Sequence, residues 1–96
     1  YMAEMNAFYE RLLTRPLSLP AIALYSVLMH LSNRARWPDT LIVPEAIITG
    51  LLGCSGRSMR RARAELVAAG VVQHLPRPGR QAPLYKIIKL STKTDT

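Results

Sequence analysis

The sequence predicts a mainly helical domain with a small β-hairpin, an α+β protein of the winged helix-turn-helix class. Two observations lead to this prediction. Between residues 44 and 69, a short apolar helix, a turn containing glycine and a second, arginine-rich helix follow one another, as in a helix-turn-helix. Between residues 71 and 90, two short apolar segments flank a proline-rich loop, which predicts the hairpin of a wing. Residues 1–90 are therefore expected to form a single domain.

The N-terminal part of the chain predicts two helices. Apolar residues recur at helical spacing over residues 4–14, which we interpret as an N-terminal helical extension ending before Arg15-Pro16. Ser18 is a suitable N-cap for a second helix that continues to about residue 33. From Ala21 to Leu31 this helix is apolar nearly all round. It is expected either to lie at the centre of the domain or to place one face on another subunit.

The first helix of the predicted helix-turn-helix is short. Residues 33–40 predict a loop and residues 41–43 a short strand before it. Pro44 suits the first helical position, and Gly53 suits a left-handed C-cap. The apolar side of this helix is expected to comprise Ile47, Ile48, Leu51 and Leu52.

The second helix, over residues 56–69, is the basic one. Ser55 is its predicted N-cap, and Gly70 ends it. Its core stripe, with members three and four residues apart, is Met59, Ala62 and Leu66. When this stripe faces inward, a rotation of about 100° per residue turns Arg57 and Arg61 almost directly outward.

The net charge of +7 lies entirely between residues 34 and 89. That stretch holds ten lysines and arginines against three acidic residues, Asp39, Glu45 and Glu65. Positive charge localised in this way favours a polyanion, and nucleic acid more than a membrane. A winged helix of this composition is therefore expected to bind double-stranded DNA.

Within the basic helix, Arg57 and Arg61 are the best candidates for base contacts, because an arginine fork can bond guanine O6 and N7 together. Ser58 is expected to reach a phosphate or a base edge, and Arg60 a phosphate. Arg63 lies nearer the core edge, and its side chain is expected to extend toward a phosphate or toward Glu65.

The predicted wing, residues 71–90, adds further basic candidates. Arg77 and Arg80 lie in its loop, where prolines reduce the entropy lost on docking, and they are expected to contact the DNA backbone or minor groove. Lys86 is expected either to extend the phosphate track or to protect a sheet edge. Residues 91–96 are expected to form a flexible tail.

Several other classes of function have little support in the sequence. We expect no enzyme, since no catalytic constellation is visible, and no cofactor or metal site, since His30 and His74 have no cluster of ligands near them. Cys54 is the only cysteine, which fits a reducing cytoplasm. No apolar run is long enough to span a membrane, and no signal peptide is recognisable.

The chain resembles the N-terminal winged-helix domain of DnaD-type replisome organisers from phages and mobile elements. The resemblance covers about residues 6–90, and the more specific part is the helix with Leu24-Tyr25 followed by residues 33–37. The other matching segments are Phe8-Tyr9, Pro16-Leu17-Ser18, Leu28-Met29-His30, Ile42-Val43-Pro44, residues 50–53, Ser55, Ala62-Arg63, Glu65-Leu66, Gly70-Val71-Val72 and residues 85–88.

This resemblance implies a role in phage-type or plasmid-type DNA replication initiation, with helicase-loading proteins as further partners. It also implies self-association through the N-terminal helices and wing, and the apolar second helix together with Phe8 and Leu12 predicts a homodimer. The family's usual C-terminal helical domain is not within these 96 residues. Two alternatives stay open, namely a transcriptional regulator with the same fold and a protein-interaction winged helix that binds an acidic partner.

Overall fold

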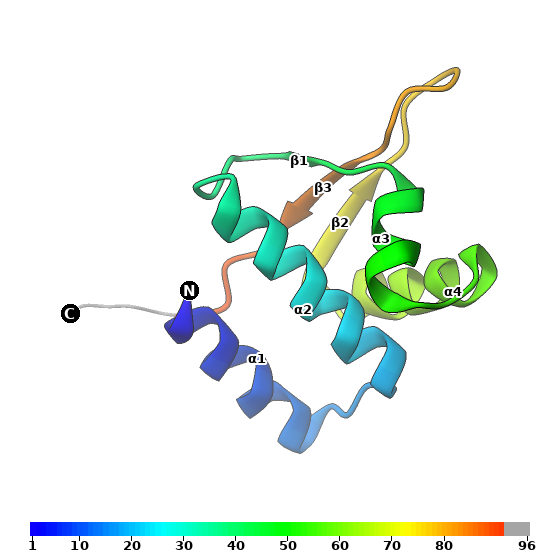
Figure 1. Ribbon diagram of the computed structural model, residues 1–96. Coiled ribbons are helices and arrows are strands. Elements are labelled where there is room, and N and C mark those ends of the chain that lie inside the picture. Colours follow the sequence, from blue (N-terminus) through cyan, green and yellow to red (C-terminus); the bar gives the residue numbers. More distant parts are fainter. Residues whose placement is uncertain (92–96) are drawn as a thin grey trace.

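The computed structural model describes residues 1–91, and this part of the chain is mainly helical with one small antiparallel sheet. The helix α2 runs through the middle of the molecule, with the other helices and the strands around it (Figure 1). The elements in chain order are α1 (Met2–Thr14), α2 (Leu19–Arg34), β1 (Leu41–Ile42), α3 (Glu45–Leu52), α4 (Gly56–Ala68), β2 (Val72–Leu75) and β3 (Leu84–Ile87).

The helix α2 begins where the sequence predicts. The side chain of Ser18 accepts a hydrogen bond from the backbone N–H of Ala21, and Pro20 occupies the first turn, where no intrahelical N–H donor is needed. The helix continues one residue beyond the predicted end, to Arg34. Its inner apolar face is buried inside this one chain, since α1 supplies Phe8, whose ring stacks on that of Tyr25 with centroids 3.8 Å apart.

The short helix α3 differs from its prediction in two ways. Pro44 has extended backbone angles and is the N-cap, so the helix begins at Glu45 and not at the proline. Of the four apolar residues expected on its inner side, only Ile48 is buried, whereas Ile47 and Leu51 are exposed. An eight-residue helix has little more than two turns, so only a narrow strip of it can meet α2 and α4.

The connection between α3 and α4 is a tight turn, as predicted. Gly53 adopts the left-handed conformation (φ 67°, ψ 35°), and its N–H donates to the carbonyl of Thr49 at 2.8 Å. Ser55 then caps α4, because its side chain accepts a hydrogen bond from the N–H of Ser58 at 3.1 Å. The helices are therefore separated by only three residues, 53–55.

The sheet has three strands in the order β1-β3-β2, all antiparallel, so β3 is the central strand. The predicted hairpin is present as β2 and β3, with His74 opposite Tyr85. Both strands are shorter than predicted, and β1 adds a third strand by placing Leu41 opposite the same Tyr85. The loop between β2 and β3 projects away from the body of the molecule (Figure 1).

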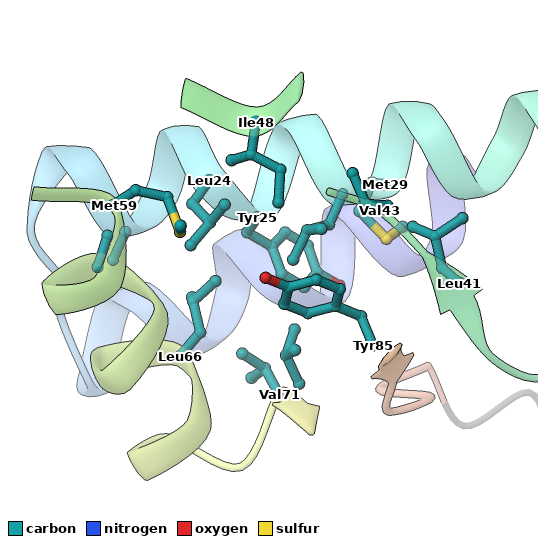
Figure 2. Close-up of a cluster of buried hydrophobic side chains, with 14 of the residues drawn as sticks. Leu24, Tyr25, Met29, Leu41, Val43, Ile48, Met59, Leu66, Val71 and Tyr85 are labelled. Atoms are coloured by element: carbon teal, nitrogen blue, oxygen red, sulfur yellow. The ribbon is translucent and has the colours of Figure 1, made fainter. Parts of the chain in front are cut away.

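The core lies between α2, α4 and the sheet. Figure 2 shows side chains from α2, α3, α4 and β3 converging on one cluster, with the Tyr85 ring at its centre. The predicted stripe of α4 contributes fully, since Met59, Ala62 and Leu66 are all buried. Burying a large apolar side chain contributes about 1.5–3 kcal/mol, so this stripe fixes which face of α4 is turned outward.

The two ends of the described chain are joined. The carboxylate of Glu4 accepts hydrogen bonds from the N–H of Leu90 at 2.7 Å, from the N–H of Ser91 at 3.1 Å and from the Ser91 hydroxyl. Burial tends to raise the pKa of Glu4, but these hydrogen bonds outweigh burial and lower the pKa. Ser91, the first residue of the predicted flexible tail, is thus held in place, and the rest of that tail lies outside the described residues. Within residues 1–91, no helix combines the length and apolar character needed to cross a membrane.

Candidate nucleic-acid interface

The helix α4 is fastened to its neighbours near its C-terminal end. A terminal nitrogen of Arg11, from α1, donates to the carbonyl of Ala69 at 2.8 Å and so satisfies a free carbonyl at the helix end. The carboxylate of Glu65 accepts from the N–H of Ser18 at 3.1 Å and from its hydroxyl at 2.6 Å. Glu65 therefore joins α4 to the start of α2, and α4 is a fixed element on which outward side chains are displayed.

Arg57 and Arg61 lie on the exposed face of α4, as the helical spacing predicts. Within residues 1–91, neither guanidinium forms an ion pair or a hydrogen bond. The two residues are four apart, so they are neighbours on one helix face. Like charges in such positions repel each other, and an anion that bridges them would remove this cost.

Arg63 has a different role from the predicted one. Its side chain is only 12% exposed, and its Nη1 donates to Glu45 Oε2 at 2.9 Å and to the Tyr85 hydroxyl at 3.1 Å. Burial tends to lower the pKa of Arg63, but the hydrogen bonds to Tyr85 and Glu45 outweigh it and raise the pKa. The prediction that Arg63 extends toward Glu65 is wrong, because Glu65 is bonded to Ser18 and Arg63 bonds Glu45 and Tyr85 instead, whereas a contribution of Arg63 to phosphate binding stays a prediction.

The side chain of Arg60 is partly exposed to solvent and also contacts the protein. Its side chain is 54% exposed, and its Nη1 lies 3.3 Å from Glu45 Oε1. Gly56 leaves room for this arrangement, since a Cβ at that position would lie 3.0 Å from Arg60 Nη1. An exposed ion pair of this kind contributes at most about 1 kcal/mol, so a phosphate can compete with Glu45 for Arg60.

Glu45 is a residue of this region that sequence reasoning did not identify. One carboxylate, at the start of α3, pairs with two of the four arginines of α4. Fifteen residues separate Glu45 from Arg60 and eighteen separate it from Arg63, so no helical or strand spacing could have predicted these contacts. The repulsion within the arginine cluster is thus partly offset by the protein itself, and among the four arginines only Arg57 and Arg61 lack such a partner within residues 1–91.

The remaining candidate on α4, Ser58, is exposed and already part of the helix cap. Its N–H donates to the Ser55 side chain, and the two hydroxyl oxygens are 3.2 Å apart. Ser58 lies one residue from Arg57, on the first turn of α4. Its hydroxyl can therefore accompany any ligand that reaches the free N-terminal turn of the helix.

The loop between β2 and β3 holds one tied and one free arginine. Arg77 Nε donates to the carbonyl of Ala82 across the loop at 2.6 Å, so this side chain braces the loop. Arg80 is exposed and follows Gly79, whose positive φ of 70° suits glycine and makes the turn at the tip. Of the two residues predicted to contact a ligand, Arg80 has no hydrogen bond or ion pair within residues 1–91, and Arg77 uses its Nε inside the loop.

Lys86 lies apart from the arginines of α4. It is exposed on β3 and pairs with Gln73 of β2, whereas the pairing with β1 covers only Leu84 and Tyr85, so both roles predicted for Lys86 stay predictions. It lines a pocket of about 510 Å³ together with Lys89, Trp37, Asp39 and Glu4, and no residue of α4 lines that pocket. Arg34 is also distant from α4. It lies at the C-terminal end of α2, whereas Glu65 contacts Ser18 at the start of that helix, and the 16 residues of α2 span about 24 Å. The basic stretch of the sequence is therefore divided between two regions of the surface.

A second cleft, of about 400 Å³, lies between α4 and β2. Its walls are Arg60, Arg63, Ala64, Val67, Ala68 and His74. No sequence pattern connects His74 with the basic helix, because the strand pairing that places it opposite Tyr85 is a tertiary feature. The cleft brings an imidazole next to two guanidinium groups, beside the free face of α4.

The apolar residues predicted to mediate self-association are mostly covered within one chain. Phe8 and the inner face of α2 are buried. The large apolar side chains left exposed on α1 and α2 are Met2, Tyr9, Leu13 and Leu19. Self-association thus stays a prediction, and the buried central face of α2 is not available for it.

The chain was compared with protein-family models, with curated proteins and with solved structures, and none of them matches it significantly.

Proposed function

We propose that this chain is a winged helix-turn-helix protein that binds duplex DNA through α4 and the loop between β2 and β3. The order of elements supports the assignment: two helices joined by a three-residue turn are followed directly by a hairpin. In this interpretation α4 is the recognition helix that enters the major groove, and the projecting loop is the wing.

The observation that carries the proposal is the pair of free arginines on a fixed helix. α4 is tied to α1, α2 and α3 through Arg11, Glu65 and Glu45, while Arg57 and Arg61 have no partner within residues 1–91. A helix held in this way loses little entropy when it docks. Its first turns present donors that fit both guanine edges and phosphates.

The structure supports a revised division of roles among the predicted residues. Arg57 and Arg61 are proposed to contact base edges, and Ser58 a phosphate or base edge beside them. Arg60 and Arg80 are proposed to contact phosphates. Arg63 is proposed as a positioning residue, because its hydrogen bonds to Glu45 and Tyr85 hold α4 against α3 and β3.

A role in replication initiation, with helicase-loading proteins as partners, rests on the resemblance to DnaD-type replisome organisers alone. A transcriptional regulator would present the same arginine face. An acidic protein partner is the alternative that the charge of α4 also allows. Duplex binding itself separates this last alternative from the other two, so it is the property to test first.

The test is a fluorescence anisotropy titration of a labelled random-sequence duplex at several salt concentrations, with a single strand of equal length beside it. Log affinity is expected to fall with log salt by about 0.9 per phosphate neutralised. The double variant Arg60→Ala/Arg80→Ala, which removes the two proposed phosphate contacts, is expected to reduce that slope by about 1.8. Arg34→Ala is the matched control, since it removes an exposed arginine far from α4 and should leave the slope unchanged. Failure to bind duplex at low salt would contradict the proposal.

A further inference from the structure

The cleft lies between α4 and β2, the strand that leads into the loop proposed to touch DNA. It is lined by small and apolar residues of α4, namely Ala64, Val67 and Ala68, and by the polar groups of Arg60, Arg63 and His74. No acidic side chain is among these lining residues, but the Glu45 carboxylate of α3 bonds both guanidinium groups, so an incoming anion competes with it for Arg60. A cleft lined by two guanidinium groups and an imidazole suits an anion of tetrahedral shape.

We propose that this cleft seats one phosphate of the DNA backbone and that His74 takes up a proton when the phosphate enters. The inference rests on the proposed function and extends it, because it assigns a ligand and a pH dependence to a place that sequence reasoning did not identify. Arg60 supplies the mobile donor, since it is half exposed. Arg63 supplies a fixed positive charge behind it.

The surroundings of His74 explain why its protonation responds to an anion. The groups that face it are Arg60 and Arg63 from α4, Glu45 from α3, and Tyr85 from β3, whose ring centroid is 5.4 Å from that of the imidazole. Burial and then the charge of Arg63 lower the pKa of His74, and Glu45 opposes them only in part. Without a ligand, His74 is therefore neutral at pH 7.

An anion in the cleft reverses this balance. A phosphate beside the imidazole favours the charged form and raises the pKa of His74, and each unit of increase corresponds to about ten-fold in affinity. Because the pKa is higher in the complex than in the free protein, binding strengthens as pH falls. As pH falls, the gain in DNA affinity begins near the pKa that His74 has in the complex. The gain is complete below the pKa that His74 has in the free protein, which lies under the ordinary histidine value of about 6.5.

The experiment follows the two histidine C–H signals by NMR between pH 5 and 8, with and without a random-sequence duplex. The sequence has two histidines, so His30→Gln assigns the signals. His30 is also the matched control, since it is exposed on α2 and does not line the cleft. We expect the duplex to raise the pKa of His74 by about one unit and to leave the positions of the His30 signals nearly unchanged at each pH.

Anisotropy titrations over the same pH range give the second measurement. The wild type and His30→Gln are expected to bind more tightly at pH 5.5 than at pH 8, by several-fold and at most about ten-fold, and His74→Gln to lose most of this dependence. An unchanged His74 pKa in the complex, or the full pH dependence in His74→Gln, would overturn the inference while leaving duplex binding intact. Absence of duplex binding at every pH would instead reject the proposed function. The NMR measurement on the wild type decides the matter even if His74→Gln folds poorly.

Discussion

The outer face of α4 and its inner flank carry the same residue type in different settings. On the outer face, Arg57 and Arg61 are exposed and have no partner within residues 1–91. On the inner flank, Arg60 and Arg63 share the carboxylate of Glu45, and Arg63 also bonds Tyr85. The difference teaches that four arginines within seven residues need not form one binding surface.

The same contrast recurs on a smaller scale in the loop between β2 and β3. Arg77 is bonded to the carbonyl of Ala82, whereas Arg80 at the tip is free. In both places, some arginines are bonded within the protein and stabilise the element, while others are exposed on its surface. Substitutions can therefore separate the two roles, because each element offers a matched pair of variants.

The largest effect is expected for Arg63→Ala, measured as the free energy of unfolding in urea. This change leaves Glu45 without its closest partner and the Tyr85 hydroxyl without its donor, and we expect a loss of about 2–3 kcal/mol. Arg57→Ala is the control, and should change stability by less than about 0.5 kcal/mol. Similar stability losses in the two variants would show that Arg63 does not hold α4 in place.

The next effect is expected in binding and not in stability. Arg57→Ala and Arg61→Ala should each weaken binding to a preferred sequence by about 1–3 kcal/mol and relax the base preference. The check is a selection of preferred duplex sequences, followed by anisotropy on preferred and scrambled sites. If both variants lost the same affinity on every sequence, these arginines would contact phosphates and not bases.

Glu45→Gln tests the inner flank directly. Removing the carboxylate charge frees Arg60 for a phosphate, so the slope of log affinity against log salt should steepen by about 0.9. The same change should cost about 1 kcal/mol of stability, because Arg63 loses a charged partner. Glu10→Gln removes an exposed carboxylate of α1 and serves as the control. An unchanged slope would mean that Arg60 is already free to reach DNA.

The smallest effects are expected in the loop. Arg80→Ala should lower the salt slope by about 0.9 and weaken binding to all sequences alike, as loss of one phosphate contact does. Arg77→Ala should leave the slope unchanged and weaken binding only because the loop becomes less ordered before docking. A reduced slope for Arg77→Ala would show that its remaining guanidinium nitrogens contact the backbone.

Much of the fold could be predicted because its signals are local. The caps Ser18, Gly53 and Ser55 act within their own turns, and the spacing of Met59, Ala62 and Leu66 sets the inner face of α4 by helix geometry alone. The hairpin was predicted for the same reason. The prediction that Ile47 and Leu51 lie on the inner side of α3 is wrong, because their exposure depends on how α3 packs against parts of the chain that are distant in sequence.

The sequence by itself determined the helices, the tight turn, the hairpin and the outward direction of Arg57 and Arg61. Only the tertiary structure decided that Glu45 takes Arg60 and Arg63, that Lys86 lies with a separate pocket, and that His74 faces α4. The reason is physical. The direction in which a helical side chain points follows from a fixed rotation per residue. Whether the charge of an arginine is available to a ligand depends instead on which distant carboxylate the fold brings within about 4 Å.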